Sequence, residues 1–163
     1  MSIKKIELCN GAIASFDEDK NIYLGYIPWN DDYIEVELSS DEYNENKIEG
    51  LKRAFETFWN ERERFVEEGK RDIKEKLLPY TIKHNSLTEI KLYPDVSIDA
   101  FDADYQLTGI VILFTFYSEV QILFNKADDL ERYDELNVMR DLESGYISFE
   151  AGGMPVLNED LNS

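Results

Sequence analysis

The chain has 163 residues, 43% of them hydrophobic and 13% aromatic, so it can bury a substantial core and is not globally disordered. Its formal net charge is −18, from 35 acidic and 17 basic residues, which disfavours nucleic acids and anionic membranes as partners. The same charge favours fast, salt-sensitive association with a basic protein.

The single cysteine rules out an intrachain disulfide and fits a reducing compartment. No apolar run near the amino terminus is long enough for a secretory signal. No uninterrupted apolar run reaches the roughly 18 residues of a membrane-spanning helix. We therefore expect a cytoplasmic, bacterial-type protein.

The first forty residues predict an antiparallel meander. In the last of its strands Ile34, Val36 and Leu38 alternate with polar residues, which is typical of a half-buried strand. Asn10-Gly11 is a hairpin signal between the first two strands. The predicted strands are Ile3–Leu8, Ala12–Phe16, Ile22–Ile27 (ended by Pro28) and Tyr33–Leu38.

A helical pattern follows the meander. Asn46 and Glu49 fit an N-terminal cap pair, and Gly69 and Pro79 mark points where the helix is expected to bend and to end. We predict one helix kinked near Gly69, or two consecutive helices, ending at Leu78. The apolar stripe that should face the core consists of Ile48, Leu51, Phe55, Phe58, Phe65 and Val66.

The second half of the chain is predicted to be mainly β-structure. Its most apolar stretch, Leu107–Asn125, reads as a hairpin that turns at Ser118-Glu119 and that the rest of the fold covers. The segment 83–86 reads as a linker, 102–104 as a turn and 126–133 as an irregular acidic loop. The other predicted strands are Leu87–Leu92, Val96–Ala100, Asp134–Arg140 and Tyr146–Glu150.

This order of elements predicts an α+β fold. We expect a mainly antiparallel sheet of two meanders, with one long or kinked central helix packed on one face. The expected boundaries are a single domain over residues 1–150 and a loose carboxy-terminal tail over residues 151–163.

Residues that could carry catalysis are few. His84 is the only histidine and falls in the predicted linker, so we expect a solvated loop side chain. Cys9 has no cationic neighbour in the sequence and is expected to be buried or half-buried. Asp99, Asp102 and Asp104 resemble part of a calcium loop, but Leu107 and Leu113 stand where such a loop needs glycine and glutamate. We expect no catalytic residues, no metal and no cofactor.

Two segments have the composition of a protein-binding surface. One is a predicted turn that joins aromatic side chains, the usual anchors of interfaces, to carboxylates. The other is the acidic loop before the last hairpin. The candidate partner-binding residues are Trp29, Asp31, Asp32 and Tyr33 in the first segment and Asp128, Asp129, Glu131 and Asp134 in the second.

Residues 87 onward, about half the chain, resemble uncharacterised bacterial domains found among the immunity proteins of polymorphic toxin systems. The similar features are Leu87-Thr-Glu-Ile90, the apolar hairpin, and Asp141-Leu-Glu-Ser-Gly-Tyr-Ile-Ser-Phe149, with Ser144 where some of those domains have histidine. The resemblance implies a small cytosolic α+β protein that binds and neutralises a toxin domain. It supplies no catalytic residues.

The leading hypothesis is therefore a non-enzymatic, acidic protein-binding domain, of the immunity type, that meets a basic partner. Two alternatives remain open. One is a small hydrolase that uses carboxylates, and the other is an accessory or structural protein that self-associates through a sheet edge or an apolar patch. The oligomeric state is not predicted.

Overall fold

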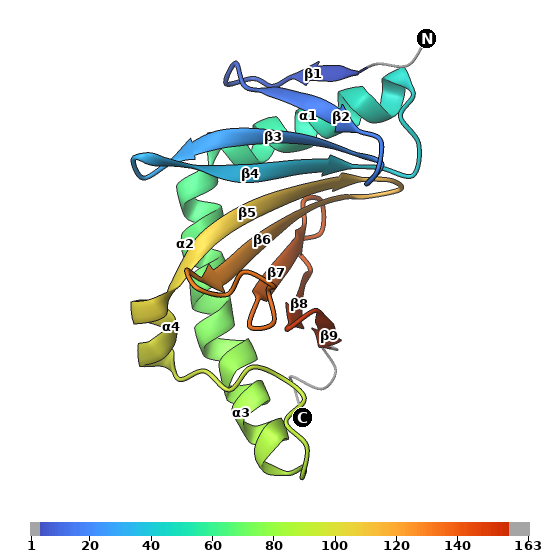
Figure 1. The fold of residues 1–163 in the computed structure, drawn as a ribbon. Coiled ribbons are helices and arrows are strands. Elements are labelled where there is room, and N and C mark those ends of the chain that lie inside the picture. The colour runs from blue at the N-terminus through green and yellow to red at the C-terminus, as the bar shows by residue number, and fades with distance from the viewer. Residues whose placement is uncertain (1–3, 157–163) are drawn as a thin grey trace. The chain divides into compact units, whose positions relative to one another are not determined.

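The chain begins with the predicted antiparallel meander. The structure is a computed structural model, drawn in Figure 1, that describes residues 4–156. The first four strands pair antiparallel with one another, the first with the second, the second with the third and the third with the fourth. They are β1 (Lys5–Glu7), β2 (Ile13–Asp17), β3 (Ile22–Trp29) and β4 (Asp32–Ser39).

A largely helical stretch then leads to a strand that lies parallel to β4. A parallel pair needs such a long connection, because its two strands start at the same end. In that pair Val36 faces Ile110 and Leu38 faces Ile112. The helical elements are α1 (Glu45–Asn60), α2 (Arg62–Asp72), the π-helix η1 (Ile73–Leu77), α3 (Leu78–Ser86) and α4 (Ile98–Asp104).

The remaining strands complete one sheet, whose order in the described residues is β1 to β9, the order of the chain. The predicted α+β class with a mainly antiparallel sheet is confirmed. The last strands are β5 (Tyr105–Phe114), β6 (Ser118–Lys126), β7 (Leu136–Asp141), β8 (Ile147–Ala151) and β9 (Met154–Val156).

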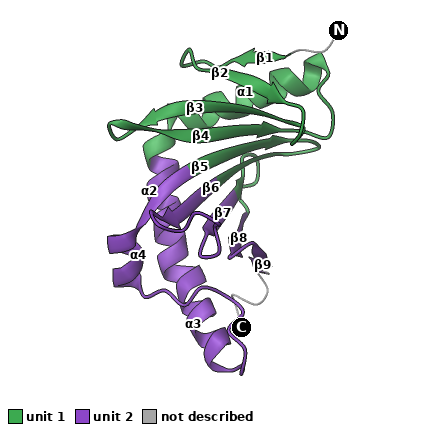
Figure 2. Cartoon of the chain, viewed as in Figure 1, with its two compact units in different colours: residues 1–63, 109–121, 140–146 green, residues 64–108, 122–139, 147–163 purple. Residues whose placement is uncertain are grey.

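The chain divides into two compact units, coloured in Figure 2. Unit 1 comprises residues 1–63, 109–121 and 140–146, and unit 2 comprises residues 64–108, 122–139 and 147–163. The single domain predicted over residues 1–150 stays a prediction.

In unit 1 the helix α1 packs closely on β5. A Cβ atom added at Gly50 would overlap the ring of Phe114, so only a glycine lets the helix lie at this distance from the strand. The predicted stripe is confirmed here, because Ile48, Leu51 and Phe55 are buried. The helix starts two residues earlier than predicted, since the Oδ1 atom of Asn44, not Asn46, accepts the capping hydrogen bond from the Lys47 N–H at 2.9 Å.

In unit 2 the helix α2 approaches the sheet in the same way. A Cβ atom on Gly69 would lie 2.9 Å from Cγ1 of Val138 and 3.6 Å from Cδ1 of Ile122. Phe65 and Val66 are buried beside it, as the stripe predicted. Of the two predicted alternatives, the structure has consecutive helices, and they separate at Glu61, while Gly69 lies inside α2 and marks a close contact.

The helix predicted to end before Pro79 continues to Ser86. A wide turn, η1, precedes the proline, and there the Leu78 N–H donates to the carbonyl of Ile73. Pro79 then occupies the first turn of α3, directly after this wide turn. Pro28 also fails to end its element, since β3 runs on to Trp29 and Pro28 pairs with Tyr33.

Several predictions for residues 83–104 are wrong. The expected linker 83–86 is the last turn of α3, and the expected strand Leu87–Leu92 has no regular structure. Val96–Ala100 is not a strand, because Ser97 accepts a capping hydrogen bond from the Ala100 N–H at 3.1 Å and starts α4. The expected turn at 102–104 is the end of that helix.

The two hairpins predicted in the second half are present, and the turn of the central one is shifted. The central hairpin turns at residues 115–117 instead of at Ser118-Glu119, and the Thr115 N–H donates to the Tyr117 carbonyl at 3.0 Å. The expected tail includes the end of β8, a turn through Gly152 and Gly153, and β9, which pairs antiparallel with β8. Residues 157–163 of that tail lie outside the described residues.

The close approach of α1 to β5 yields a stability test. We expect Gly50→Leu to lower the free energy of unfolding by about 1–3 kcal/mol, because the added side chain forces the Phe114 ring from its place. Urea denaturation followed by circular dichroism measures the change. Glu49→Leu is the control, since it adds the same side chain at an exposed position of α1 and should change stability by less than about 0.5 kcal/mol. Equal effects of the two substitutions would contradict the role of Gly50.

Candidate binding surfaces

The first predicted surface lies at the turn between β3 and β4. Trp29 and Asp32 face each other across the ladder, and the two residues between them have positive φ, +47° at Asn30 and +63° at Asp31. Two left-handed residues form the tight turn that matches the twist of a hairpin, and asparagine and aspartate tolerate this conformation best after glycine. The short loop therefore holds the carboxylates in one defined arrangement.

The structure brings the four predicted residues of this surface together. Asp31 and Asp32 are exposed, Trp29 is half-buried, and Tyr33 is 68% exposed. The Oδ1 atom of Asp32 accepts a hydrogen bond from the Tyr33 N–H at 2.8 Å, which orients that carboxylate. The result is an exposed aromatic residue that directly follows two exposed acidic residues at the end of one hairpin of unit 1.

The same face of the hairpin carries further residues of this kind, which the sequence analysis did not select. Tyr26 is exposed and lies opposite Glu35, while Pro28 lies opposite Tyr33. The alternation that points Ile34, Val36 and Leu38 inward also points Tyr33 and Glu35 outward, so the signal was present in the sequence. Trp29 and Asp32, which pair with each other, lie on the other face of the hairpin, next to the turn. We call Tyr26, Trp29, Asp31, Asp32, Tyr33 and Glu35 together the hairpin surface.

The second predicted surface is the loop between β6 and β7, in unit 2. Here the four acidic residues have different roles. The carboxylate of Asp129 accepts from the N–H groups of Tyr133 (3.1 Å) and Asp134 (2.8 Å), so it holds the loop together. The Asp134 carboxylate lies 3.5 Å from the Lys126 ammonium. Asp128 and Glu131 are exposed.

This loop also presents two apolar side chains that the sequence analysis passed over. Leu130 is 91% exposed and Tyr133 is exposed as well. No periodic pattern exists in an irregular loop, so the sequence offered no means to tell which side chains point outward. The two predicted surfaces lie in different units.

A buried polar cluster anchors the base of that loop. Glu135 is buried, and its carboxylate accepts from the side-chain amides of Asn125 (2.8 Å) and Asn137 (3.0 Å). The Arg132 guanidinium lies 3.5 Å from the same carboxylate. The Oδ1 atoms of both asparagines are buried and have no hydrogen-bond partner in the described part of the chain.

Tyr105 fixes the loop from β5. Its hydroxyl donates to the Asp134 carbonyl at 2.9 Å, and the Lys126 ammonium lies 5.9 Å from its ring centre. Burial, together with the charges of Asp134 and other nearby carboxylates, raises the pKa of Tyr105 far above its usual range. The hydroxyl thus stays protonated and keeps donating to the loop.

The residues considered for nucleophilic chemistry have ordinary surroundings. Cys9 is exposed, contrary to the prediction; desolvation of its thiol and then the charge of Glu56 raise the pKa of Cys9, which disfavours the reactive thiolate. His84 is not a solvated loop residue, because it lies in α3, stacks on Tyr80 with ring centres 5.4 Å apart, and meets the edge of Tyr93.

The acidic residues considered for calcium lie on or beside α4. The Asp102 carboxylate forms an ion pair with Lys74 at 3.0 Å. Within residues 4–156 no group of three or more histidine, cysteine, aspartate or glutamate side chains could hold a metal ion.

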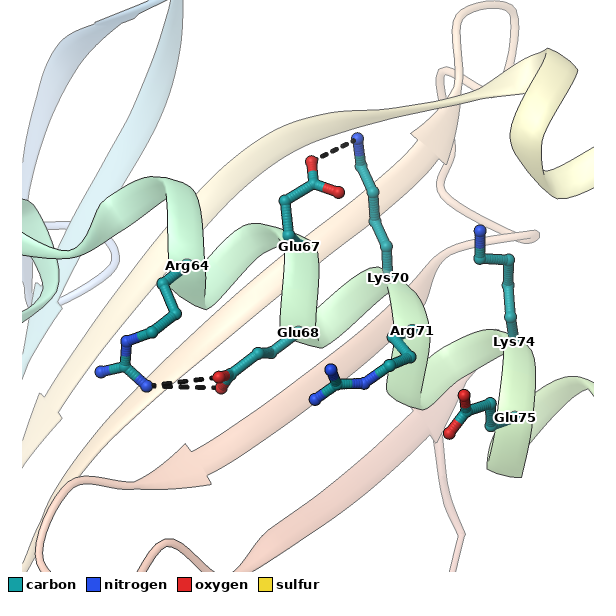
Figure 3. Close-up of a pocket in the computed structure, with 7 residues that line it drawn as sticks. All are labelled: Arg64, Glu67, Glu68, Lys70, Arg71, Lys74 and Glu75. Atoms are coloured by element: carbon teal, nitrogen blue, oxygen red, sulfur yellow. Dashed lines mark hydrogen bonds and ion pairs between the residues drawn. The ribbon is translucent and has the colours of Figure 1, made fainter.

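An open pocket lies along α2 and η1, and Figure 3 shows the charged side chains around it. Arg64 lies 3.4 Å from Glu68, and Lys70 lies 3.6 Å from Glu67. Such exposed pairs along one helix face contribute little energy each and keep the face solvated. The lining residues are Arg64, Glu67, Glu68, Lys70, Arg71, Lys74 and Glu75.

The turn between β7 and β8 is shaped by Asp141 and Ser144. The Oδ1 atom of Asp141 accepts from the N–H groups of Ser144 (2.8 Å) and Glu143 (2.9 Å), and Ser144 Oγ accepts from the Tyr146 N–H. Hydrogen bonding from the Ser144 N–H is the main cause that lowers the pKa of Asp141. Ser144, the residue that replaces histidine in the resembling domains, thus has a structural role in the turn.

Comparisons with protein-family models, with curated proteins and with solved structures find no match to this chain. Among the described residues, no helix is both long enough and apolar enough to span a membrane.

The buried cluster predicts a large effect of one substitution. Glu135→Ala should lower the free energy of unfolding by about 2–4 kcal/mol, because it leaves two buried amide groups without their acceptor. Urea denaturation measures it. Glu131→Ala removes the same side chain from an exposed position of the same loop and should stay within about 0.5 kcal/mol of the unmodified protein. A Glu135→Ala protein as stable as the control would show that the cluster is not needed.

The turn at Asp141 predicts a pH dependence. A carboxyl group whose pKa is lower in the folded state stabilises the fold above its unfolded pKa of about 3.9, and this contribution disappears as the pH falls through the folded pKa. Asp141→Asn should therefore have a lower urea midpoint than the unmodified protein at neutral pH, and the gap should close in acid. Glu143→Gln, the same change at the next exposed residue, should show no gap at either pH. A gap for Asp141→Asn that stays constant with pH would rule out the charge as its cause.

Proposed function

We propose that this chain is a non-enzymatic protein-binding domain that contacts a basic partner through the hairpin surface. The observation that carries the proposal is the exposure of Tyr33 and Tyr26 on one face of a hairpin whose two-residue turn and its flank also expose Asp31 and Asp32. Aromatic side chains supply much of the energy of protein interfaces, and a rigid turn loses little entropy when it binds. The carboxylates beside the rings select for lysine and arginine on the partner.

The net charge of the whole chain also favours a basic partner. A net charge of −18 accelerates encounter with a cationic protein and repels anionic ones. Residues 84–163 alone hold 16 acidic and 4 basic residues, a net charge of −12. The loop with Asp128, Leu130, Glu131 and Tyr133 offers a second acidic surface with exposed apolar groups.

The proposed biological role is that of an immunity-type protein that neutralises a basic toxin in the cytoplasm. Toxins that act on nucleic acids are basic because their substrate is anionic, and an acidic binder meets such a surface directly. The sequence resemblance to immunity domains supports this role. The alternative that this chain is a carboxylate-dependent hydrolase stays a prediction. Such an enzyme needs an available carboxyl group, and both oxygens of the buried Glu135 carboxylate already accept hydrogen bonds.

The proposal is tested by comparing captured proteins across matched variants. The immobilised protein is incubated with a lysate of its source organism at about 50 mM and about 500 mM salt, since charge-driven association weakens as the Debye length falls. The same is done with the variant Asp31→Lys/Asp32→Lys/Tyr33→Ser. The control variant Glu18→Lys/Asp19→Lys places two equivalent charge reversals on another exposed turn of unit 1.

We expect a basic protein that the unmodified chain retains at low salt and loses at high salt. The hairpin variant should bind it at least about tenfold more weakly, as expected when a central aromatic anchor and two charges are changed. The control variant should retain it. If both variants bind a basic partner equally well, the interface does not lie on the hairpin surface. The absence of any basic partner would contradict the proposal.

A further inference from the structure

The sheet of unit 1 has one face that carries carboxylates among apolar side chains. Val36 and Leu38 of β4 are buried on the other face, so the alternation of the strand points Glu35 and Glu37 to this one. The neighbouring strand β3 and residues 109–114 of β5 belong to the same unit, as Figure 2 shows. This face therefore extends beyond the β3–β4 turn along the whole length of β4.

The strand register sets two rows of side chains across this face. In one row Tyr26 of β3 lies beside Glu35. In the next row Leu24 lies beside Glu37, which in turn lies beside Val111 of β5. Tyr26 is 56% exposed and the other four side chains are half-buried. We call Leu24, Tyr26, Glu35, Glu37 and Val111 the open face.

The charge around the open face is negative over a wide stretch of unit 1. Residues 13–39 contain seven acidic residues and one lysine, and residues 109–121 contain one glutamate and no basic residue. When the flanking segments are counted, residues 4–44 hold 10 acidic and 3 basic residues, a net charge of −7. A second copy of the chain, a nucleic acid or an anionic membrane is repelled by such a surface, so it fits a cationic segment of another protein.

The place of β4 in the sheet decides the form of that segment. Both edges of β4 are already paired, to β3 and to β5, so a partner cannot add a strand there and must contact the face through its side chains. A helix about 10 Å wide covers three strands that lie about 4.8 Å apart. Glu35 and Glu37 are about 6.8 Å apart along the strand, close to the rise of about 6 Å between helix residues four apart.

We infer that the open face binds an amphipathic helix of a basic partner, which lies along β4 and places lysine or arginine side chains, one turn apart, on Glu35 and Glu37. Apolar side chains on the flanks of that helix contact the apolar side chains of the open face on β3 and β5. The helix reaches the β3–β4 turn at Tyr33, the next residue of β4 on the same face. The inference rests on the proposed function and adds the form of the partner segment.

The test uses a phage-displayed library of a helical peptide that is randomised on one face and selected against the full chain at about 50 mM salt. Fluorescence anisotropy then measures the affinity of the selected peptides for the variant Glu35→Gln/Glu37→Gln, which removes two charges and keeps the shape of both side chains. The control variant, Glu18→Gln/Glu56→Gln, makes the same change at two exposed positions of unit 1 outside the open face. Circular dichroism and the urea midpoint establish that both variants are folded.

We expect the selected peptides to carry lysine or arginine at positions four apart, with apolar residues beside them. They should bind the test variant at least about tenfold more weakly than the control variant, because two charge pairs are lost. Selected peptides without this pattern, or peptides that bind both variants equally well, would overturn the inference.

The inference and the proposed function can fail separately. The basic partner captured from the lysate is also tested for binding to Glu35→Gln/Glu37→Gln. If the hairpin variant loses this partner while Glu35→Gln/Glu37→Gln binds it as well as the control variant does, the proposed function stands and the inference is overturned. If the peptides behave as expected but the lysate contains no basic partner, the open face is supported as a site for a basic helix and the proposed function is contradicted.

Discussion

The contact of the helices with the sheet depends on two glycines. At Gly50 in unit 1 and at Gly69 in unit 2, the backbone of a helix comes so near to Phe114 or Val138 that a side chain would not fit. The close contact lets Ile48, Leu51 and Phe55 in one unit, and Phe65 and Val66 in the other, reach the buried face of their strands. With that face filled, the polar and aromatic residues of the hairpin are left on the solvent side.

The periodic parts of the fold could be predicted from the sequence. The alternation at Ile34, Val36 and Leu38 and the stripe from Ile48 to Val66 both report which face is buried, and the structure confirms them. Residues 87–104 could not be predicted in this way. Leu87–Leu92 looks like a strand because it is rich in aliphatic residues, but its backbone is bound by the side chain of Asn85, a contact that leaves no periodic trace.

The candidate binding surfaces, like the fold, could be predicted from the sequence in part. Trp29, Asp31, Asp32 and Tyr33 were selected because aromatic and acidic residues adjoin in one turn, and the structure places them together on the β3–β4 hairpin. Tyr26 joins them only through the pairing of two strands, which the sequence does not show directly. In the acidic loop, composition alone did not distinguish Asp129, which holds the backbone, from Asp128 and Glu131, which are exposed.

The wide turn η1 has a consequence for how this chain can change in length. It accommodates one residue more than a regular helical turn, so that Ile73, Leu77, Leu78 and Thr81 all remain buried. Deleting a single residue between 73 and 77 would therefore turn this wide turn into a regular helical turn and leave the rest of the helix facing the same way relative to α2. Such a deletion keeps Thr81 on the buried face, so a version of this segment that is shorter by one residue can keep the same core and the same apolar pattern.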